Sequence, residues 1–156
     1  MAFDTPAGTR GARQPRAGTM MRFINKTAAG RIRRTGKMMG FKALNLTTIG
    51  AKTGAERTSP VGWFPGPDDS WLIVASAAGA VRNPAWYYNI AANPDKVTIE
   101  VEGRMIPVTA AQLHGDERDQ AWQQITTAVP RFGGYQQKTD REIPVIRLVA
   151  RPGSDG

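Results

Sequence analysis

The sequence contains no cysteine and only one histidine, His114, among its 156 residues. Without cysteine the chain has no disulfide, no thiolate metal ligand and no thiol nucleophile. A multi-histidine metal site or a histidine-activated nucleophile would depend on His114 alone. We therefore expect no metal centre and no catalytic nucleophile of these kinds.

Long apolar segments are also lacking. The longest apolar-rich stretch, Trp71 to Val81, is about half as long as a membrane span requires. Residues 1–19 lack the apolar core of a signal peptide. We therefore expect a cytoplasmic protein, and we leave open that it binds peripherally to the inner face of the membrane.

The net charge of +8 is unevenly distributed. Residues 1–42, the basic head, contain ten Lys or Arg and one acid, for a net charge of +9, whereas residues 43–156 have a net charge of −1. A basic head suits an anionic partner such as a phospholipid surface or a nucleic acid. The near-neutral body and the lack of a nucleic-acid module make nucleic acid the weaker alternative, and a solubilising tail is the other.

Within the head, residues 1–18 are rich in Gly, Pro, Arg and Ala, which predicts disorder. Residues 19–42 combine apolar and basic side chains, which predicts a basic amphipathic helix broken near Gly30 or Gly36. Such a helix can lie on an anionic membrane or cover one end of a barrel. Both alternatives stay open at this stage.

The body, residues 43–150, reads as about six short strands with two helices, followed by a disordered tail at 151–156. Closely spaced strands with few helices predict a small antiparallel barrel. We expect strands at 43–49, 57–64, 71–75, 97–101, 104–110 and 142–150, and helices at 84–92 and 116–129. Pro60 indicates a strand edge or bulge, and Asn83 fits the N-cap of the first helix.

The turn between the first two strands of the body carries two cations, Lys52 and Arg57. If the flanking strands pair, both cations project from one end of the barrel beside the hydroxyls of Thr53, Thr58 and Ser59. Cations, hydroxyls and exposed backbone N–H groups together suit a phosphate. A solvated hairpin tip is the alternative that the spacing alone leaves open.

Two later segments are further candidates. Small residues follow the strand that ends near Ser76, and they allow a planar ligand or a phosphate to approach the backbone. Trp86 and Asn89 share one face of the helix that begins near Pro84, although Trp86 also fits ordinary core packing. Beyond the second helix, Pro130, Gly133 and Gly134 predict a loop. In it, Phe132 and Tyr135 either close over a bound ring or anchor the loop.

Taken together, these segments resemble the deazaflavin (F420)-dependent nitroreductases, also described as F420H2-dependent quinone reductases. The resemblance covers about residues 44 to 149, with several motifs in matching order and spacing. It rests on Leu46-Thr47-Thr48-Ile49-Gly50, Lys52-Thr53-Gly54, Arg57-Thr58, Pro60, Val74-Ala75-Ser76, Asn83-Pro84-Ala85-Trp86-Tyr87, Asn89, Ala92-Asn93-Pro94, Tyr135-Gln136 and Thr139-Asp140-Arg141-Glu142-Ile143-Pro144-Val145.

The resemblance implies a split β-barrel that binds coenzyme F420 and donates a hydride to a quinone-like acceptor. In this picture the protein supplies binding, orientation and exclusion of water, while the cofactor supplies the reactivity. A non-catalytic F420 carrier and an FMN-binding oxidase of the same barrel type are the alternatives. The implied cofactor contacts are Ala51, Lys52, Thr53, Arg57, Thr58, Ser59, Pro60, Val61, Ala75, Ser76, Ala77, Ala85, Trp86, Asn89 and Phe132, and Tyr135 is the implied catalytic residue.

The sequence departs from the family pattern in two places. The nitroimidazole-activating members have a tyrosine-rich acceptor wall, where this chain has Gly62, Val129 and Phe132 and keeps Tyr135. The resemblance therefore does not extend to nitroimidazole reduction. In the loop after Ser76, Ala77 and Ala78 stand where a Lys-Gly pair is usual, and Arg82 is the nearest candidate to supply the missing cation.

Overall fold

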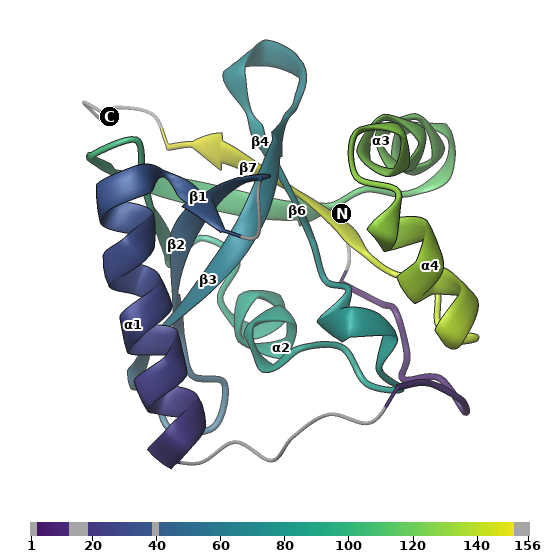
Figure 1. Cartoon of the computed structure of the whole chain (residues 1–156), viewed down its shortest axis with the longest axis horizontal. Helices are drawn as coiled ribbons and strands as arrows, with labels where there is room; N and C mark the ends of the chain where they lie inside the picture. The colour runs from purple at the N-terminus through teal and green to yellow at the C-terminus, as the bar shows by residue number, and fades with distance from the viewer. Residues whose placement is uncertain (1–2, 13–18, 39–40, 152–156) are drawn as a thin grey trace.

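The structure is a computed structural model that describes residues 3–12, 19–38 and 41–151. Six antiparallel strands form a closed barrel in the order β2-β3-β4-β7-β6-β5, and β5 pairs back with β2 (Figure 1). The strands are β2 Phe41–Ile49, β3 Glu56–Pro65, β4 Trp71–Val74, β5 Val97–Val101, β6 Arg104–Gln112 and β7 Val145–Ala150, and the short β1 Lys37–Met38 pairs antiparallel with the start of β2. The predicted split barrel is confirmed.

Alternating side chains produce this barrel. Val97, Ile99 and Val101 on β5 point into the interior, and the residues between them are half-buried. β7 is buried on both sides at its first two residues, Val145 and Ile146. Ile146 belongs to the barrel interior, whereas Val145 belongs to a second core outside the barrel.

The second core is covered by α3 Gly115–Ala128 and α4 Arg131–Lys138. α3 matches the predicted helix and buries Ala121 and Ile125. The loop predicted after it is wrong, because residues 131–138 are helical despite Gly133 and Gly134. Burial of Phe132 against Phe64, with ring centroids 5.9 Å apart, outweighs the low helix propensity of glycine.

The helix α2 Ala85–Ala92 begins one residue later than expected, and its N-cap is Pro84. The prediction that Asn83 caps this helix is wrong. The Asn83 side chain is buried, donates to the Thr5 carbonyl at 3.0 Å and accepts a hydrogen bond from Arg141 at 2.6 Å. Its polar atoms are therefore committed to tertiary contacts instead of the helix end.

In the basic head, α1 Thr19–Thr35 runs through Gly30 without a break and ends just before Gly36, whose φ is +70°. Ala29 and Ile32 are buried, and the Ala29 carbonyl accepts a hydrogen bond from Asn45 on the outer face of β2 at 3.2 Å. α1 therefore covers the barrel, although along the side formed by β2 and β3 and not at an end (Figure 1).

Residues 3–12, which we call the N-terminal strap, are not disordered as predicted. Gly8 N–H donates to the Val81 carbonyl and Ala12 N–H to the Gly79 carbonyl, both at 2.8 Å. Thr9 binds the Asp140 carboxylate through both its N–H and its hydroxyl. Amino-acid composition does not predict these contacts, because each of them joins residues far apart in the sequence. Residues 1–2, 13–18 and 152–156 of the predicted disordered ends lie outside the described part of the chain.

Candidate functional site

The hairpin tip between β2 and β3 exposes the two cations that the sequence singled out. Its backbone is closed by a bond from Gly50 N–H to the Ala55 carbonyl at 2.7 Å and one from Gly54 N–H to the Gly50 carbonyl at 2.9 Å. The side chains of Lys52, Thr53 and Arg57 are exposed around it. Lys52 and Thr53 lie on the turn itself and Arg57 lies at the start of β3, so the two predicted cations lie at the same end of the hairpin.

Hydrogen bonds from helix α2 stabilise this tip. Asn89 accepts a hydrogen bond from Ala51 N–H at 3.0 Å and donates one to the Thr48 hydroxyl at 3.2 Å. Arg57 lies directly opposite Thr48 in the β2–β3 pairing, so it shares that face of the hairpin. The Asn89 side chain, predicted to touch the cofactor, is used here to hold the turn.

β3 has an uncovered edge next to the tip. β3 pairs with β2 from Glu56 to Gly62, whereas the described pairing of β3 with β4 includes only Trp63, Phe64 and Pro65. The predicted residues Thr58, Ser59, Pro60 and Val61 lie on this uncovered stretch. Pro60 therefore occupies an edge position, as its missing N–H predicted.

The residues along this edge alternate between two environments. Val61 is buried in the barrel core and Ser59 is half-buried. Thr58 points to the other face, where its hydroxyl lies 3.0 Å from that of Thr47. Along this stretch Ser59 and Val61 face the barrel side and Thr58 faces the outer side, and the described part of β4 does not pair with it.

Where β4 ends, the chain turns away from β3 into the loop that includes η2 Ala77–Gly79. The predicted Ala75 and Ser76 stand at its start, Ala75 fully buried and Ser76 half-buried. Their carbonyls both accept hydrogen bonds from the Arg141 guanidinium at 2.9 Å. In the sequence Arg141 stands within the motif from Thr139 to Val145, and no pattern around it signals its burial.

The α2 residues divide into two groups. Ala85 is exposed at the start of the helix, whereas Trp86 and Tyr87 are buried in the barrel core. The Tyr87 hydroxyl lies 2.5 Å from Gln112 Oε1 and accepts from Thr5 N–H, and burial raises the pKa of Tyr87. For these two aromatic side chains the structure supports the core-packing interpretation.

Phe132 and Tyr135 lie on α4, which packs against η2. Phe132 is buried in the second core, and Tyr135 is half-buried at 5.7 Å from it, ring centroid to centroid, in an edge-to-face arrangement. Lys138 lies 5.8 Å from the Tyr135 ring. Of the two aromatic residues, Tyr135 is therefore the one with exposed surface near the loop.

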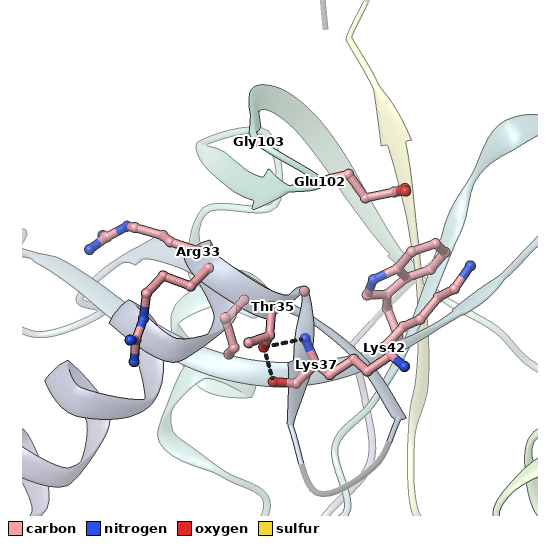
Figure 2. A pocket seen from close by; sticks show the side chains of 10 residues that line it. Arg33, Thr35, Lys37, Lys42, Glu102 and Gly103 are labelled. Carbon is pink, nitrogen blue, oxygen red and sulfur yellow. Dashed lines mark hydrogen bonds between the residues drawn. The ribbon is translucent and has the colours of Figure 1, made fainter.

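Two cavities lie at the opposite end of the β2–β3 hairpin from the tip. The first, of about 390 Å³, is lined by Ile32, Arg33, Arg34, Thr35, Gly36, Lys37, Lys42, Trp63, Glu102 and Gly103. Figure 2 shows Lys37 and Lys42 on one side of this cavity and Glu102 on the other. The second, of about 540 Å³, adjoins it at Trp63 and reaches Trp71 and Arg104. Neither contains a predicted cofactor residue.

Comparison with known proteins identifies the family. A model of the F420H(2)-dependent quinone reductase family matches residues 19–150. The F420H(2)-dependent quinone reductase Rv1261c of Mycobacterium tuberculosis (strain ATCC 25618 / H37Rv) is 40% identical over 112 residues, which cover 70% of this chain and 74% of the relative.

Two solved structures are also similar to this chain. An F420-H2 dependent reductase, FDR-A, is 36% identical, with a TM-score of 0.61, and covers 69% of this chain and 93% of its own. A structure described as a domain-swapped dimer is 31% identical, with a TM-score of 0.62, and covers 84% of this chain and all of its own. The chain therefore belongs to the F420H(2)-dependent quinone reductase family, whose oxidoreductases use coenzyme F420, and the FMN alternative is not needed.

Proposed function

We propose that this protein reduces quinone-like acceptors with F420H2 bound between the hairpin tip, the uncovered edge of β3 and the loop after β4. The observation that carries the proposal is the tip itself. It places the exposed cations Lys52 and Arg57 at one end of a strand edge that β4 does not cover.

The donor set at the tip fits the phosphate of F420. An ammonium and a guanidinium supply charge and directed N–H donors, and the Thr53 and Ser59 hydroxyls add neutral donors, whereas the Thr58 hydroxyl lies on the other face of β3 against Thr47. Next to them, we infer that a planar ring system would lie along the β3 edge and beside Ala77, whose small, half-buried side chain obstructs it least. When bound, the cofactor supplies the transferable hydride.

The protein's own part in the reaction is binding and orientation. The Tyr135 hydroxyl is our candidate for a hydrogen bond to an acceptor carbonyl, because α4 holds this ring beside the loop. Such a bond would stabilise negative charge that develops on the oxygen during reduction.

Titration with F420 tests the site assignment. Lys52→Ala with Arg57→Ala should weaken F420 binding by at least about 10-fold, because two charge-assisted contacts are lost. The matched control, Arg34→Ala with Lys37→Ala, removes the same charge from the opposite end of the hairpin and should leave the affinity unchanged. Equal affinity in the tip variant and the wild type would rule out the phosphate site.

A quinone panel tests the reaction. The loaded protein should oxidise F420H2 when a quinone is added, and Tyr135→Phe should slow turnover while F420 affinity stays unchanged. Tight F420 binding with no oxidation by any quinone would favour the non-catalytic carrier.

For the basic head we propose contact with an anionic membrane surface on the cytoplasmic side. The buried face of α1 covers the barrel, so the contact would use the exposed cations Arg31, Arg34 and Lys37 together with Lys42. Lys42, at the cavity of Figure 2, lies 5.2 Å from the ring of Trp63, which is largely buried and also lines that cavity. Among the described residues, no helix has the length and apolarity to cross a bilayer.

Cosedimentation with liposomes tests this contact. Vesicles containing phosphatidylserine should retain the protein at low salt and release it as salt rises, because exposed charges are screened. Arg34→Ala with Lys37→Ala should reduce retention, and Lys52→Ala with Arg57→Ala is the control of equal charge. Equal retention of both variants and the wild type would refute a contact through this face.

A further inference from the structure

The loop between β4 and α2 contains three consecutive residues with left-handed backbone. Their φ angles are +47° for Ala77, +54° for Ala78 and +81° for Gly79. Glycine adopts this region freely, but each alanine is disfavoured there by roughly 10-fold in population. Other contacts must therefore hold Ala77 and Ala78 in place.

The Arg141 guanidinium ties the two sides of this loop together. On the side before the left-handed residues it donates to the carbonyls of Ala75 and Ser76, both at 2.9 Å. On the far side it donates to the Ala80 carbonyl at 3.1 and 3.2 Å and to Asn83 Oδ1 at 2.6 Å. The residue is only 2% exposed.

Only an arginine can make this set of bonds. The guanidinium is a rigid planar fork with five donors, whereas a lysine ammonium is a single point with three. All the acceptors of Arg141 named above are neutral oxygens, so the buried charge gains no carboxylate partner from them. Burying such a charge is costly, which indicates that it serves to fix one conformation.

The N-terminal strap braces the same loop from outside. Its contacts with Gly79 and Val81 place it directly over the left-handed residues (Figure 1). A Cβ on Gly11 would lie 2.4 Å from Val81 N and 2.6 Å from the Ala80 carbonyl carbon, so the two backbones touch. The loop is thus held between Arg141 and the strap.

We propose that Arg141 is a positioning residue that pre-forms the left-handed loop for F420 binding. The inference rests on the proposed function, which assigns Ser76 and Ala77 to the cofactor site. Held in this conformation, the loop needs no reorganisation when the cofactor binds. Pre-formed loops bind more tightly because the ordering has already occurred on folding.

The test first weakens F420 binding through Arg141 and then asks whether glycines in the loop restore it. Arg141→Lys keeps the charge but loses the fork, and it should weaken F420 binding by about 10-fold, the population cost of one left-handed alanine. Adding Ala77→Gly and Ala78→Gly removes the Cβ cost, and should recover most of that loss. In the wild-type background the two glycines should change the affinity by less than about two-fold, because the loop is already formed.

A matched control separates positioning from general stability. Arg118→Lys alters another buried arginine, which donates to the Ile143 carbonyl at 2.7 Å and not to a carbonyl of residues 75–83. It should lower the melting temperature without changing F420 affinity. Unchanged affinity in Arg141→Lys would overturn the proposal, as would a loss that the glycines do not rescue.

Two further measurements keep the test decisive. If Arg141→Lys does not fold, Asn83→Ala removes one acceptor of Arg141 and should still speed amide exchange at residues 77–81 in the cofactor-free protein. Unchanged exchange there would contradict the proposal. If the wild type does not bind F420 at all, the proposed function fails, whereas the exchange experiment still reports on Arg141.

Discussion

The side-chain oxygen of Asn89 accepts a hydrogen bond from the backbone N–H of Ala51 at 3.0 Å, which fastens helix α2 to the tip of the β2–β3 hairpin. The amide nitrogen of Asn89 completes the link through the Thr48 hydroxyl. A turn held in this way keeps its cations in place before any ligand arrives, which lowers the ordering cost of binding.

Asn89→Ala should therefore affect both stability and binding. Losing two partners from a buried site should cost about 1–3 kcal/mol of unfolding free energy, measured by urea denaturation. F420 affinity should fall as well, because the tip becomes mobile. Asn93→Ala, at the C-cap of the same helix, is the control and should leave F420 affinity unchanged.

Asp140 should make the strap sensitive to acid. Hydrogen bonds from the Thr9 hydroxyl, the Thr9 N–H and the Arg10 N–H lower the pKa of Asp140 to about 2 from 3.8. Because the folded-state pKa is depressed, its stabilising effect is complete above pH 3.8 and is lost as the pH falls toward 2.

Amide exchange of residues 8–12 measured against pH checks this assignment. Asp140→Asn should open the strap faster than the wild type at pH 6, and the two proteins should converge as the pH approaches 2. A difference that stays constant over this range would show that the Asp140 charge does not hold the strap.

Gly79 and Gly54 offer a matched pair of glycine substitutions. Both have positive φ, +81° and +73°. Gly54→Ala adds only the left-handed strain of about 1–2 kcal/mol, since nothing lies within 4 Å of its new Cβ. Gly79→Ala places a Cβ 2.6 Å from the Tyr135 carbonyl oxygen, so it should cost more and displace α4 from the loop.

Thermal and urea unfolding of the two variants give the comparison. Gly79→Ala should also weaken F420 binding, whereas Gly54→Ala should preserve the loop after β4. Equal destabilisation of the two proteins would mean that α4 and the loop do not pack as closely as the structure has them.

Alanine substitutions at two residues of β7 should differ in their cost in unfolding free energy, because one residue is buried and the other is exposed. Ile146 is fully buried in the barrel interior, and Val149 is 41% exposed on the same strand. Ile146→Ala should cost about 2–5 kcal/mol because it leaves a cavity. Val149→Ala should stay within about 0.5 kcal/mol, and similar values for the two would contradict the assigned facing of β7.

Local sequence signals identified most of the barrel. The two strands expected at 97–101 and 104–110 pair with each other in the structure, across the turn at Glu102-Gly103. The strand expected at 142–150 is present as β7, and the two cores meet at its residues Val145 and Ile146. These features depend on neighbours in sequence, so a single chain reveals them.

Local signals failed where distant partners decide the conformation. Gly133 and Gly134 suggested a loop, but packing of Phe132 on Phe64 made the segment helical. Asn83 looked like a helix cap, yet it bonds to residues far away in the chain. Propensity is a small energy, and a buried aromatic contact or a satisfied buried amide exceeds it.

The sequence by itself determined the barrel, the family and the cations of the hairpin tip. Strand period, turn chemistry and motif spacing are all written in consecutive residues. Only the tertiary structure decided what holds the neighbouring loop, because Arg141 and Ala80 are 61 residues apart and the acceptor is a backbone carbonyl. Every residue carries such a carbonyl, so no side-chain pattern can reveal which one a buried guanidinium will bind.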